Sequence, residues 1–359
     1  MSKFKLEFSL KQHTPLIHFQ SEQSGATLRA TELKPKLDRF LLEHVKDIPF
    51  KENTNGHRSL DYKVKVEAKT EISDVETINS RNKKTIPNPL FFGNMGDGEK
   101  KRFSMASSIS IEFFSFNSEV LNAIKNNFES FLANTNFGTR QSKGFGSFYL
   151  KQPFDKSLIK HKVYSFASTQ ETWQEDIKFF YAFLRAGINT ANFGGIYAKA
   201  VIFSYAKSRG ITWDKKAIKN YYLDSNRNIE DEKLVRDLFG LSSSQNWMSY
   251  KATITKEHIA KEIDRFKSPI TFNPVLENGK MSIYFWADKS VEKILNKEFM
   301  VKFDRKSGLK LKTPKSFTFD EFFEFAFNLD LSKHISLEYH TNNHYSKLVR
   351  MFKEIKEVK

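Results

Sequence analysis

The chain has 359 residues, and no cysteine is among them. This length is sufficient for two domains with a sizeable core, while the absence of cysteine excludes disulfides and cysteine-based zinc sites. The formal net charge of +16 favours a polyanionic partner, and most of it comes from residues 156–359, which hold 35 basic and 24 acidic residues.

The chain begins with a strand and a helix. Polar and apolar side chains alternate over residues 3–11, which predicts a strand with one buried face. Apolar residues recur at helical spacing over residues 28–46, with Thr31 as a possible N-cap. Because proline is tolerated only at the start of a helix, we expect Pro35 in the first turn.

The next four predicted elements are two strands, a helix and a short strand. Alternating residues predict strands over 62–68 and 109–113, and the proline- and glycine-containing segment 70–105 between them is expected to be an insertion loop. An apolar stripe over 118–132, capped by Asn or Ser, predicts a second helix, and a short strand follows near 145–151. The order β-α-β-β-α-β is that of a ferredoxin-like, RRM-like unit, whose open sheet face commonly binds single-stranded RNA.

The second half of the chain is less regular. We expect a linker over 154–172, helical structure over 173–209, and strands over 250–255, 270–275, 281–286 and 299–303. An Asn-Gly pair predicts a hairpin turn at 278–279, and helices are expected over 320–327 and 345–355. The fold class is therefore α+β: a ferredoxin-like domain at 1–155, then a second, degraded ferredoxin-like domain with a helical insertion at 156–359. No segment approaches transmembrane length and the N-terminus lacks an apolar leader, so we expect a cytoplasmic protein without membrane contact.

A glycine-rich basic loop, FGTRQSKGFGSF, occupies Phe137–Phe148. Glycines allow positive φ and close backbone approach to a ligand, and basic side chains add donors for phosphate. Its polar and glycine positions are Gly138, Arg140, Gln141, Lys143, Gly144 and Gly146. We expect Arg140 and Lys143 to be exposed, whereas about two of the three aromatic residues Phe145, Phe148 and Tyr149 should enter the core.

Three segments carry a family resemblance. LKQHTPLIHF (Leu10–Phe19), LRATELKPKLDRFL (Leu28–Leu41) and the glycine-rich loop resemble the RAMP superfamily of CRISPR systems, most closely the first RAMP subunit of the type III-B (Cmr) effector complex. Leu238–Gly240 and Arg265–Val275 agree more weakly, and Thr31 and Pro35 depart from the serine and glycine of the family motif.

The resemblance implies a non-catalytic RNA-binding subunit that grips crRNA, target RNA or both in antiviral defence, together with other subunits of the complex. The residues assigned to RNA contact are Lys11, His13, Arg29, Lys34, Arg39, Gly138, Arg140, Gln141, Lys143, Gly144, Gly146, Arg265 and Lys267. A basic cluster that includes Lys302, Lys310 and Lys312 adds charge.

One alternative function is enzymatic. His13 could act as a general base on a ribose 2′-OH, as in metal-independent RAMP endoribonucleases that process CRISPR repeat RNA, but no second acid or base is identifiable. Asp38 and Asp61 could be metal-binding carboxylates, although a solvated helix-surface role is favoured for Asp38. We therefore expect no catalytic residue, metal or cofactor; a basic structural subunit facing protein partners is a third possibility.

Overall fold

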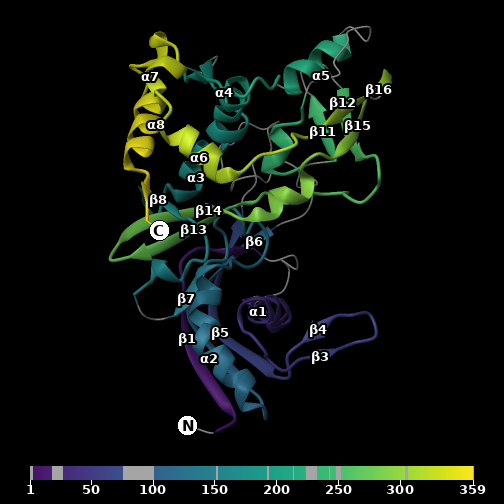
Figure 1. The fold of residues 1–359 in the computed structure, drawn as a ribbon. Helices are drawn as coiled ribbons and strands as arrows, with labels where there is room; N and C mark the ends of the chain where they lie inside the picture. The colour runs from purple at the N-terminus through teal and green to yellow at the C-terminus, as the bar shows by residue number, and fades with distance from the viewer. Residues whose placement is uncertain are drawn as a thin grey trace. The chain divides into compact units, whose positions relative to one another are not determined.

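The computed structural model describes residues 3–17, 27–75, 101–150, 153–191, 194–212, 214–223, 233–241, 243–247, 252–303 and 306–358. The chain divides into two compact units (Figure 1). The first comprises Met1–Glu175, Phe272–Phe285 and Lys356–Lys359; the second comprises Asp176–Thr271 and Trp286–Ile355. Within the described ranges, no helix has both the length and the apolarity needed to cross a membrane.

The first unit is built around a five-stranded antiparallel sheet. β6 pairs with β5 on one side and with β1 and β2 on the other, and β7 pairs with the second side of β1. The elements are β1 (Lys5–Gln12), β2 (Leu16–Ile17), α1 (Ala30–His44), β5 (Lys63–Val75), β6 (Lys101–Phe114), α2 (Ser118–Ala133) and β7 (Phe148–Leu150), with a small β3 (Lys51–Glu52) and β4 (Arg58–Ser59) ribbon. The insertion loop expected over 70–105 is shorter than predicted because both long strands extend into it; its central residues 76–100 lie outside the described residues.

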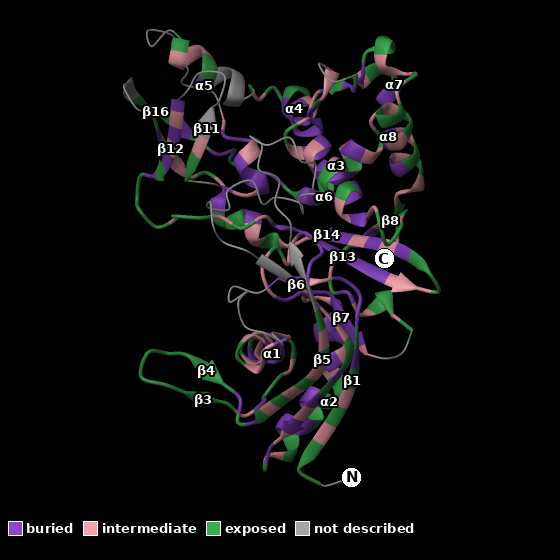
Figure 2. Cartoon of the chain, turned by 180° about the vertical axis from the view of Figure 1, so that it is seen from behind, coloured by how far each residue is buried: buried purple, intermediate pink, exposed green. Residues whose placement is uncertain are grey.

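The two helices cover one face of this sheet. The ring of Phe128 in α2 lies 4.8 Å from that of Phe8 in β1 and 5.1 Å from that of Phe113 in β6, while Phe131 of α2 contacts Phe40 of α1. Exposed and partly buried residues alternate along β1 (Figure 2). One face of the sheet therefore forms the core with the helices, and the other carries the polar side chains.

The ends of the two helices were predicted with unequal success. Asn117 caps α2 as expected, since its side-chain oxygen accepts hydrogen bonds from the N–H groups of Glu119 and Val120. The N-cap of α1 is Arg29, so the prediction of Thr31 is wrong. The expectation that Pro35 lies in the first turn is also wrong. Pro35 is the sixth residue of α1, beyond the first turn, and it has no N–H to donate to the helix.

A second sheet in the first unit joins distant parts of the chain. Its order is β13 (Ile270–Glu277), β14 (Lys280–Ala287), β8 (Tyr164–Ser168) and β17 (Lys356–Glu357). The linker predicted over 154–172 thus contains a paired strand, β8, and that prediction is wrong. The hairpin turn between β13 and β14 was predicted correctly, with Asn278 and Gly279 both at positive φ.

The second unit combines helices with a four-stranded antiparallel sheet. The helical structure predicted over 173–209, in two stretches separated at Gly194-Gly195, is interrupted earlier than expected. The chain leaves α3 after Arg185, passes Gly187 at φ 80°, and forms a two-stranded ribbon before α4. The four strands predicted between 250 and 303 do not share one sheet, since two of them are β13 and β14. The elements are α3 (Trp173–Arg185), β9 (Ile188–Asn189), β10 (Tyr197–Ala198), α4 (Val201–Ser208), α5 (Asp214–Leu223), β11 (Ser244–Trp247), β12 (Ala252–His258), β15 (Glu298–Phe303), β16 (Lys306–Lys312), α6 (Phe319–Phe327), α7 (Leu331–His334) and α8 (Asn343–Glu354).

Candidate nucleic-acid interface

The glycine-rich loop, Phe137–Phe148, closes onto the chain segment that links β1 to β2. The N–H of Thr139 donates to the Ile17 carbonyl and the N–H of Gly146 to the Pro15 carbonyl, both at 2.9 Å. The hydroxyl of Thr14 donates to the Gly144 carbonyl at 2.6 Å and accepts from the N–H of Ser147 at 3.0 Å. Both ends of the loop are therefore fixed by bonds within the first unit.

The glycines of the loop serve this close packing. Gly138 has φ 76°, and a Cβ atom on it would lie 2.6 Å from Leu16 Cδ1 and 2.7 Å from the Ile17 oxygen. Gly146 has φ 70°, and a Cβ there would overlap the carbonyl of Phe137. Gly144 also adopts positive φ, at 89°. At Gly138 and Gly146, the close backbone approach that the sequence suggested for a ligand is made to the chain itself.

Lys36 joins helix α1 to the loop. Its Nζ donates to Glu32 Oε1 at 2.7 Å, to the Asn136 carbonyl at 3.0 Å and to Gln141 Oε1 at 2.8 Å. Glu32 also accepts from the N–H of Gly138 at 2.8 Å. Burial is the main cause that lowers the pKa of Lys36, opposed by Glu32 and assisted by the charge of Arg39. Sequence reasoning missed Glu32 and Lys36 as loop contacts, although their i,i+4 spacing predicts their ion pair.

Cations follow one another from α1 to the tip of the loop. Arg39 is exposed on α1 and close enough to Lys36 to affect its pKa. Arg140 is exposed at the tip and adopts φ 61°, a conformation uncommon for a residue other than glycine. Gln141, the residue after Arg140, bonds to Lys36. We call Lys36, Arg39 and Arg140 the basic track.

Backbone donors accompany the basic track. The N–H groups of Gln141 and Ser142 donate to no residue in the described part of the chain. They follow Arg140 directly in the chain, so two successive backbone donors come next to a basic residue in the loop. Successive N–H groups in a turn can bind an anionic oxygen.

Lys143 is buried, which contradicts its expected exposure. Only 7% of its surface is accessible, its backbone bridges to Phe272, and its ammonium lies 5.7 Å from the centre of the Phe272 ring. The neighbouring aromatic residues Phe145, Phe148 and Tyr149 are all buried as well, one more than predicted. The segment around Phe272, more than a hundred residues away, covers this end of the loop.

His13 is also buried, with 7% of its surface exposed. Its Nδ1 accepts a 2.7 Å hydrogen bond from the N–H of Leu276 in β13, and its ring meets that of Tyr149 edge-on at 5.0 Å. Burial, assisted by the charge of Lys11, lowers the pKa of His13 to about 4. His13 is therefore neutral at pH 7 and joins two sheets of the first unit.

The remaining candidates of the first unit have varied surroundings. Lys11 is exposed and its Nζ donates to the Leu276 carbonyl at 3.2 Å, while Arg29 is half-buried. Lys34 forms a 3.0 Å ion pair with Asp38, donates to the Leu60 carbonyl, and lies 3.9 Å from the centre of the Tyr62 ring. Asp38 is an i,i+4 partner as predicted, but it is buried rather than solvated.

Carboxylates of the described residues do not converge on a metal site. Asp61 is exposed and pairs with Lys51 at 2.9 Å, whereas Asp38 pairs with Lys34. In the described ranges, no group of three or more histidine, aspartate and glutamate residues has the arrangement needed to hold a metal ion.

The open face of the five-stranded sheet is covered largely by charged side chains. Lys5 pairs with Glu112 at 2.9 Å, and Lys65 pairs with Glu67 at 2.6 Å. Phe114, cross-strand partner of Lys5, is an aromatic residue at one end of this face. RRM domains stack bases on aromatic residues of this face, so its composition does not favour the same binding mode.

The basic cluster of the second unit is partly neutralised where the structure describes it. Lys302 pairs with Glu257 at 2.6 Å, and Lys310 and Lys312 both pair with Glu298, at 2.9 and 2.7 Å. The basic cluster predicted here is therefore less charged than its sequence suggests. The candidates Arg265 and Lys267 are exposed in this unit, in the segment before β13.

Comparison with known proteins identifies both halves of the chain. The family model for the Cmr1 N-terminal domain matches residues 3–188, and that for the Cmr1 C-terminal domain matches residues 197–357. Among solved structures, Cmr1 from Pyrococcus furiosus in its apo form is similar at 12% identity, with 80% of this chain and 89% of that chain covered and a TM-score of 0.40. No curated protein matches the chain.

Proposed function

Because this chain belongs to the Cmr1 family, we propose that it is a non-catalytic subunit that binds crRNA, target RNA or both through the basic track. Membership of this family implies a subunit of a type III-B CRISPR effector complex. The proposal concerns the RNA contact itself and the residues that make it.

The observation that carries the proposal is the continuity of the basic track. Lys36 bonds directly to Gln141, and this bond holds the helix that carries Arg39 against the loop that carries Arg140. Guanidinium groups bind phosphate through several donors, and the N–H groups of Gln141 and Ser142 add further donors in the same loop. Exposed cations held in fixed positions suit a nucleic-acid backbone.

We further infer that the first unit is ferredoxin-like. Its elements β1, α1, β5, β6, α2 and β7 follow the β-α-β-β-α-β order. The sheet order β5-β6-β1-β7, antiparallel throughout, and the two helices on one face support this inference. The proposed RNA contact lies at the loop before β7 and not on the open sheet face.

The surroundings of His13 support a non-catalytic role over the endoribonuclease alternative. A general base must reach the 2′-OH of the substrate and should have a pKa near the working pH. The Nδ1 of His13 is occupied by the N–H of Leu276, its ring is buried, and its pKa is about 4. Such an imidazole is a weak base with little access to RNA.

The proposal can be tested with the full chain and a fluorescein-labelled repeat-containing RNA. Arg39→Gln combined with Arg140→Gln should weaken RNA binding by about tenfold, because two phosphate contacts are lost. The matched control is Lys63→Gln combined with Lys65→Gln, which removes two exposed cations from the open sheet face and should change affinity less than about twofold. A larger effect of the control pair than of the track pair would refute the proposal.

The same RNA tests the absence of catalysis. Wild-type protein should shift the RNA on a native gel and leave it uncut over hours, with magnesium or with chelator. Specific cleavage that resists chelator and is lost in His13→Ala would establish the endoribonuclease instead.

A further inference from the structure

Two adjoining cavities open on the second unit. They have volumes of about 270 and 450 Å³ and share Tyr205, Arg209 and Glu321 in their walls. These side chains come from α4, the residue just after it, and α6. We call the two cavities together the α4–α6 groove.

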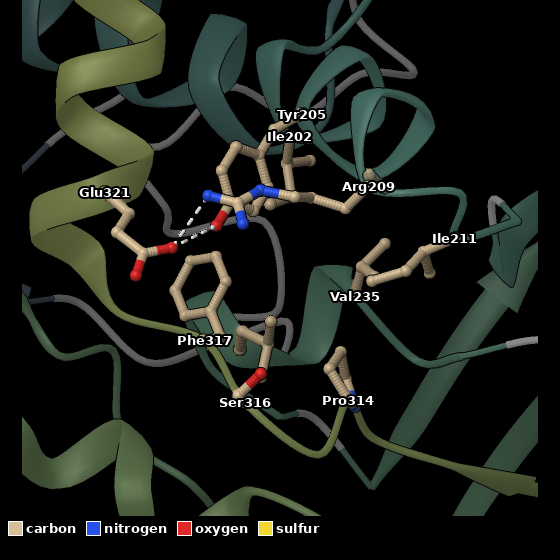
Figure 3. Close-up of a pocket in the computed structure, with 11 residues that line it drawn as sticks. Ile202, Tyr205, Arg209, Ile211, Val235, Pro314, Ser316, Phe317 and Glu321 are labelled. Atoms are coloured by element: carbon tan, nitrogen blue, oxygen red, sulfur yellow. Dashed lines mark hydrogen bonds and ion pairs between the residues drawn. The ribbon is translucent and has the colours of Figure 1, made fainter.

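The smaller cavity has a largely apolar wall and a charged edge (Figure 3). At the edge, Glu321 accepts from Arg209 at 2.9 Å and from the Tyr205 hydroxyl at 3.2 Å. Its apolar wall residues are Ile202, Ala206, Ile211, Val235, Leu238, Pro314 and Phe317. Its volume lies just below the usual range for small-molecule sites, so it suits one apolar side chain better than a complete nucleotide.

The larger cavity adds negative charge to the groove. It is lined by Glu324 and Asp330 as well as by the shared Glu321, together with the apolar Phe325 and Leu329. Arg209 is the one cation among the described lining residues of the two cavities. Three carboxylates against one guanidinium make the groove locally acidic, in a chain whose net charge is +16.

The negative charge of the groove determines which class of molecule can bind there. A nucleic-acid backbone would be repelled by the carboxylates, whereas lysine or arginine would be attracted to them. Glu324 makes no ion pair within the described structure. Asp330 is exposed; it pairs with Lys333 at 3.4 Å and caps α7 by accepting from the N–H and the hydroxyl of Ser332. An incoming cation could therefore bind either carboxylate without breaking a buried interaction.

We propose that the α4–α6 groove docks a basic segment of a neighbouring subunit. A large apolar side chain of that segment enters the smaller cavity, and lysine or arginine residues beside it pair with Glu324 and Asp330. The inference rests on family membership, which implies such neighbours, and it is independent of the RNA contact at the basic track.

A site-specific crosslink locates the occupant. The full chain, with the photoreactive residue p-benzoylphenylalanine in place of exposed Asn328, which lines the larger cavity without belonging to its carboxylates, is assembled with the other subunits of its complex and irradiated. The crosslinked peptide should come from another subunit, carry net positive charge and contain a large apolar residue. Crosslinks to RNA or to an acidic segment, or none in complexes shown by native mass spectrometry to be assembled, would overturn the proposal.

Charge reversal measures the contribution of the groove. Glu324→Lys combined with Asp330→Lys should reduce affinity for the remaining complex by about tenfold or more, because attraction becomes repulsion. Glu292→Lys combined with Glu338→Lys makes the same change at two other exposed positions of the unit and should leave affinity unchanged. Both variants should remain folded and keep the RNA gel shift of the wild type, which separates failure of the groove from failure of RNA binding. The groove pair should lower the melting temperature by a few degrees, because Asp330 also caps α7. Equal effects of the two pairs would contradict the inference.

Discussion

His13 should make the first unit sensitive to mild acid. The buried ring accepts the N–H of Leu276 at 2.7 Å, and protonation of Nδ1 would abolish that bond and place a charge in the core. Substitution by asparagine keeps a short acceptor for the same N–H while it removes the titrating group. His13→Asn is therefore the informative perturbation.

The sign and size of the effect follow from the lowered pKa. The unfolded chain binds the proton near pH 6.5 and the folded chain only near pH 4, so the stability contributed by neutral His13 is complete above 6.5 and is lost as pH falls toward 4. The full loss is roughly 3 kcal/mol at ~1.4 kcal/mol per pKa unit. Between about pH 7.5 and pH 5, about 2 kcal/mol of it should be lost.

Urea denaturation at several pH values provides the measurement, with near-UV circular dichroism as the signal. Other groups also titrate in this range, so the useful quantity is the difference in pH dependence between wild type and His13→Asn. The variant should lose about 2 kcal/mol less than the wild type over this interval. Parallel pH profiles for the two proteins would show that His13 is not held neutral, and the assignment of its buried role would be wrong.

Three further substitutions test contacts within one unit or the other, each by urea denaturation. Gly146→Ala should destabilise the protein by more than about 2 kcal/mol, because the new Cβ overlaps the Phe137 carbonyl at positive φ; a neutral effect would disprove the close approach. Lys143→Ala should cost about 1–3 kcal/mol through lost packing of its buried stem, whereas an exposed lysine would cost almost nothing. In the second unit, Lys256→Met should cost about 3–5 kcal/mol, since it leaves the buried carboxylate of Asp237, now bonded at 2.5 Å, without its cation; addition of Asp237→Leu should restore part of the loss.

Local patterns predicted the elements whose signals lie within a few residues. The apolar stripe and capping asparagine of α2 identify it almost to the residue, and strict alternation identifies β1. The Asn278-Gly279 turn is equally local. Within residues 173–209, however, Tyr197 has helical spacing with Val201 and Tyr205, so the sequence suggests helical structure at a residue that the chain uses in the β9–β10 ribbon.

The candidate site was only partly predictable because tertiary contacts decide its exposure. Lys143 and Arg140 look equivalent in a glycine-rich loop, but the distant Phe272 segment covers one and leaves the other exposed. Glu32 and Lys36 form a readable i,i+4 pair, yet their bonds to the loop depend on how α1 lies against it. Exposure of the residues in the basic track therefore required the structure.

The central claim is that phosphate contacts at the basic track hold RNA, and the salt dependence of affinity tests it most directly. Fluorescence anisotropy of a labelled single-stranded RNA, measured between about 50 and 200 mM salt, should show wild-type affinity falling on the order of a hundredfold if ~5 contacts are made. Arg39→Gln combined with Arg140→Gln should reduce the slope of log affinity against log salt by about 1.4, at ~0.7 per lost contact on a single strand. A slope that is flat in the wild type, or identical in the two proteins, would contradict the account.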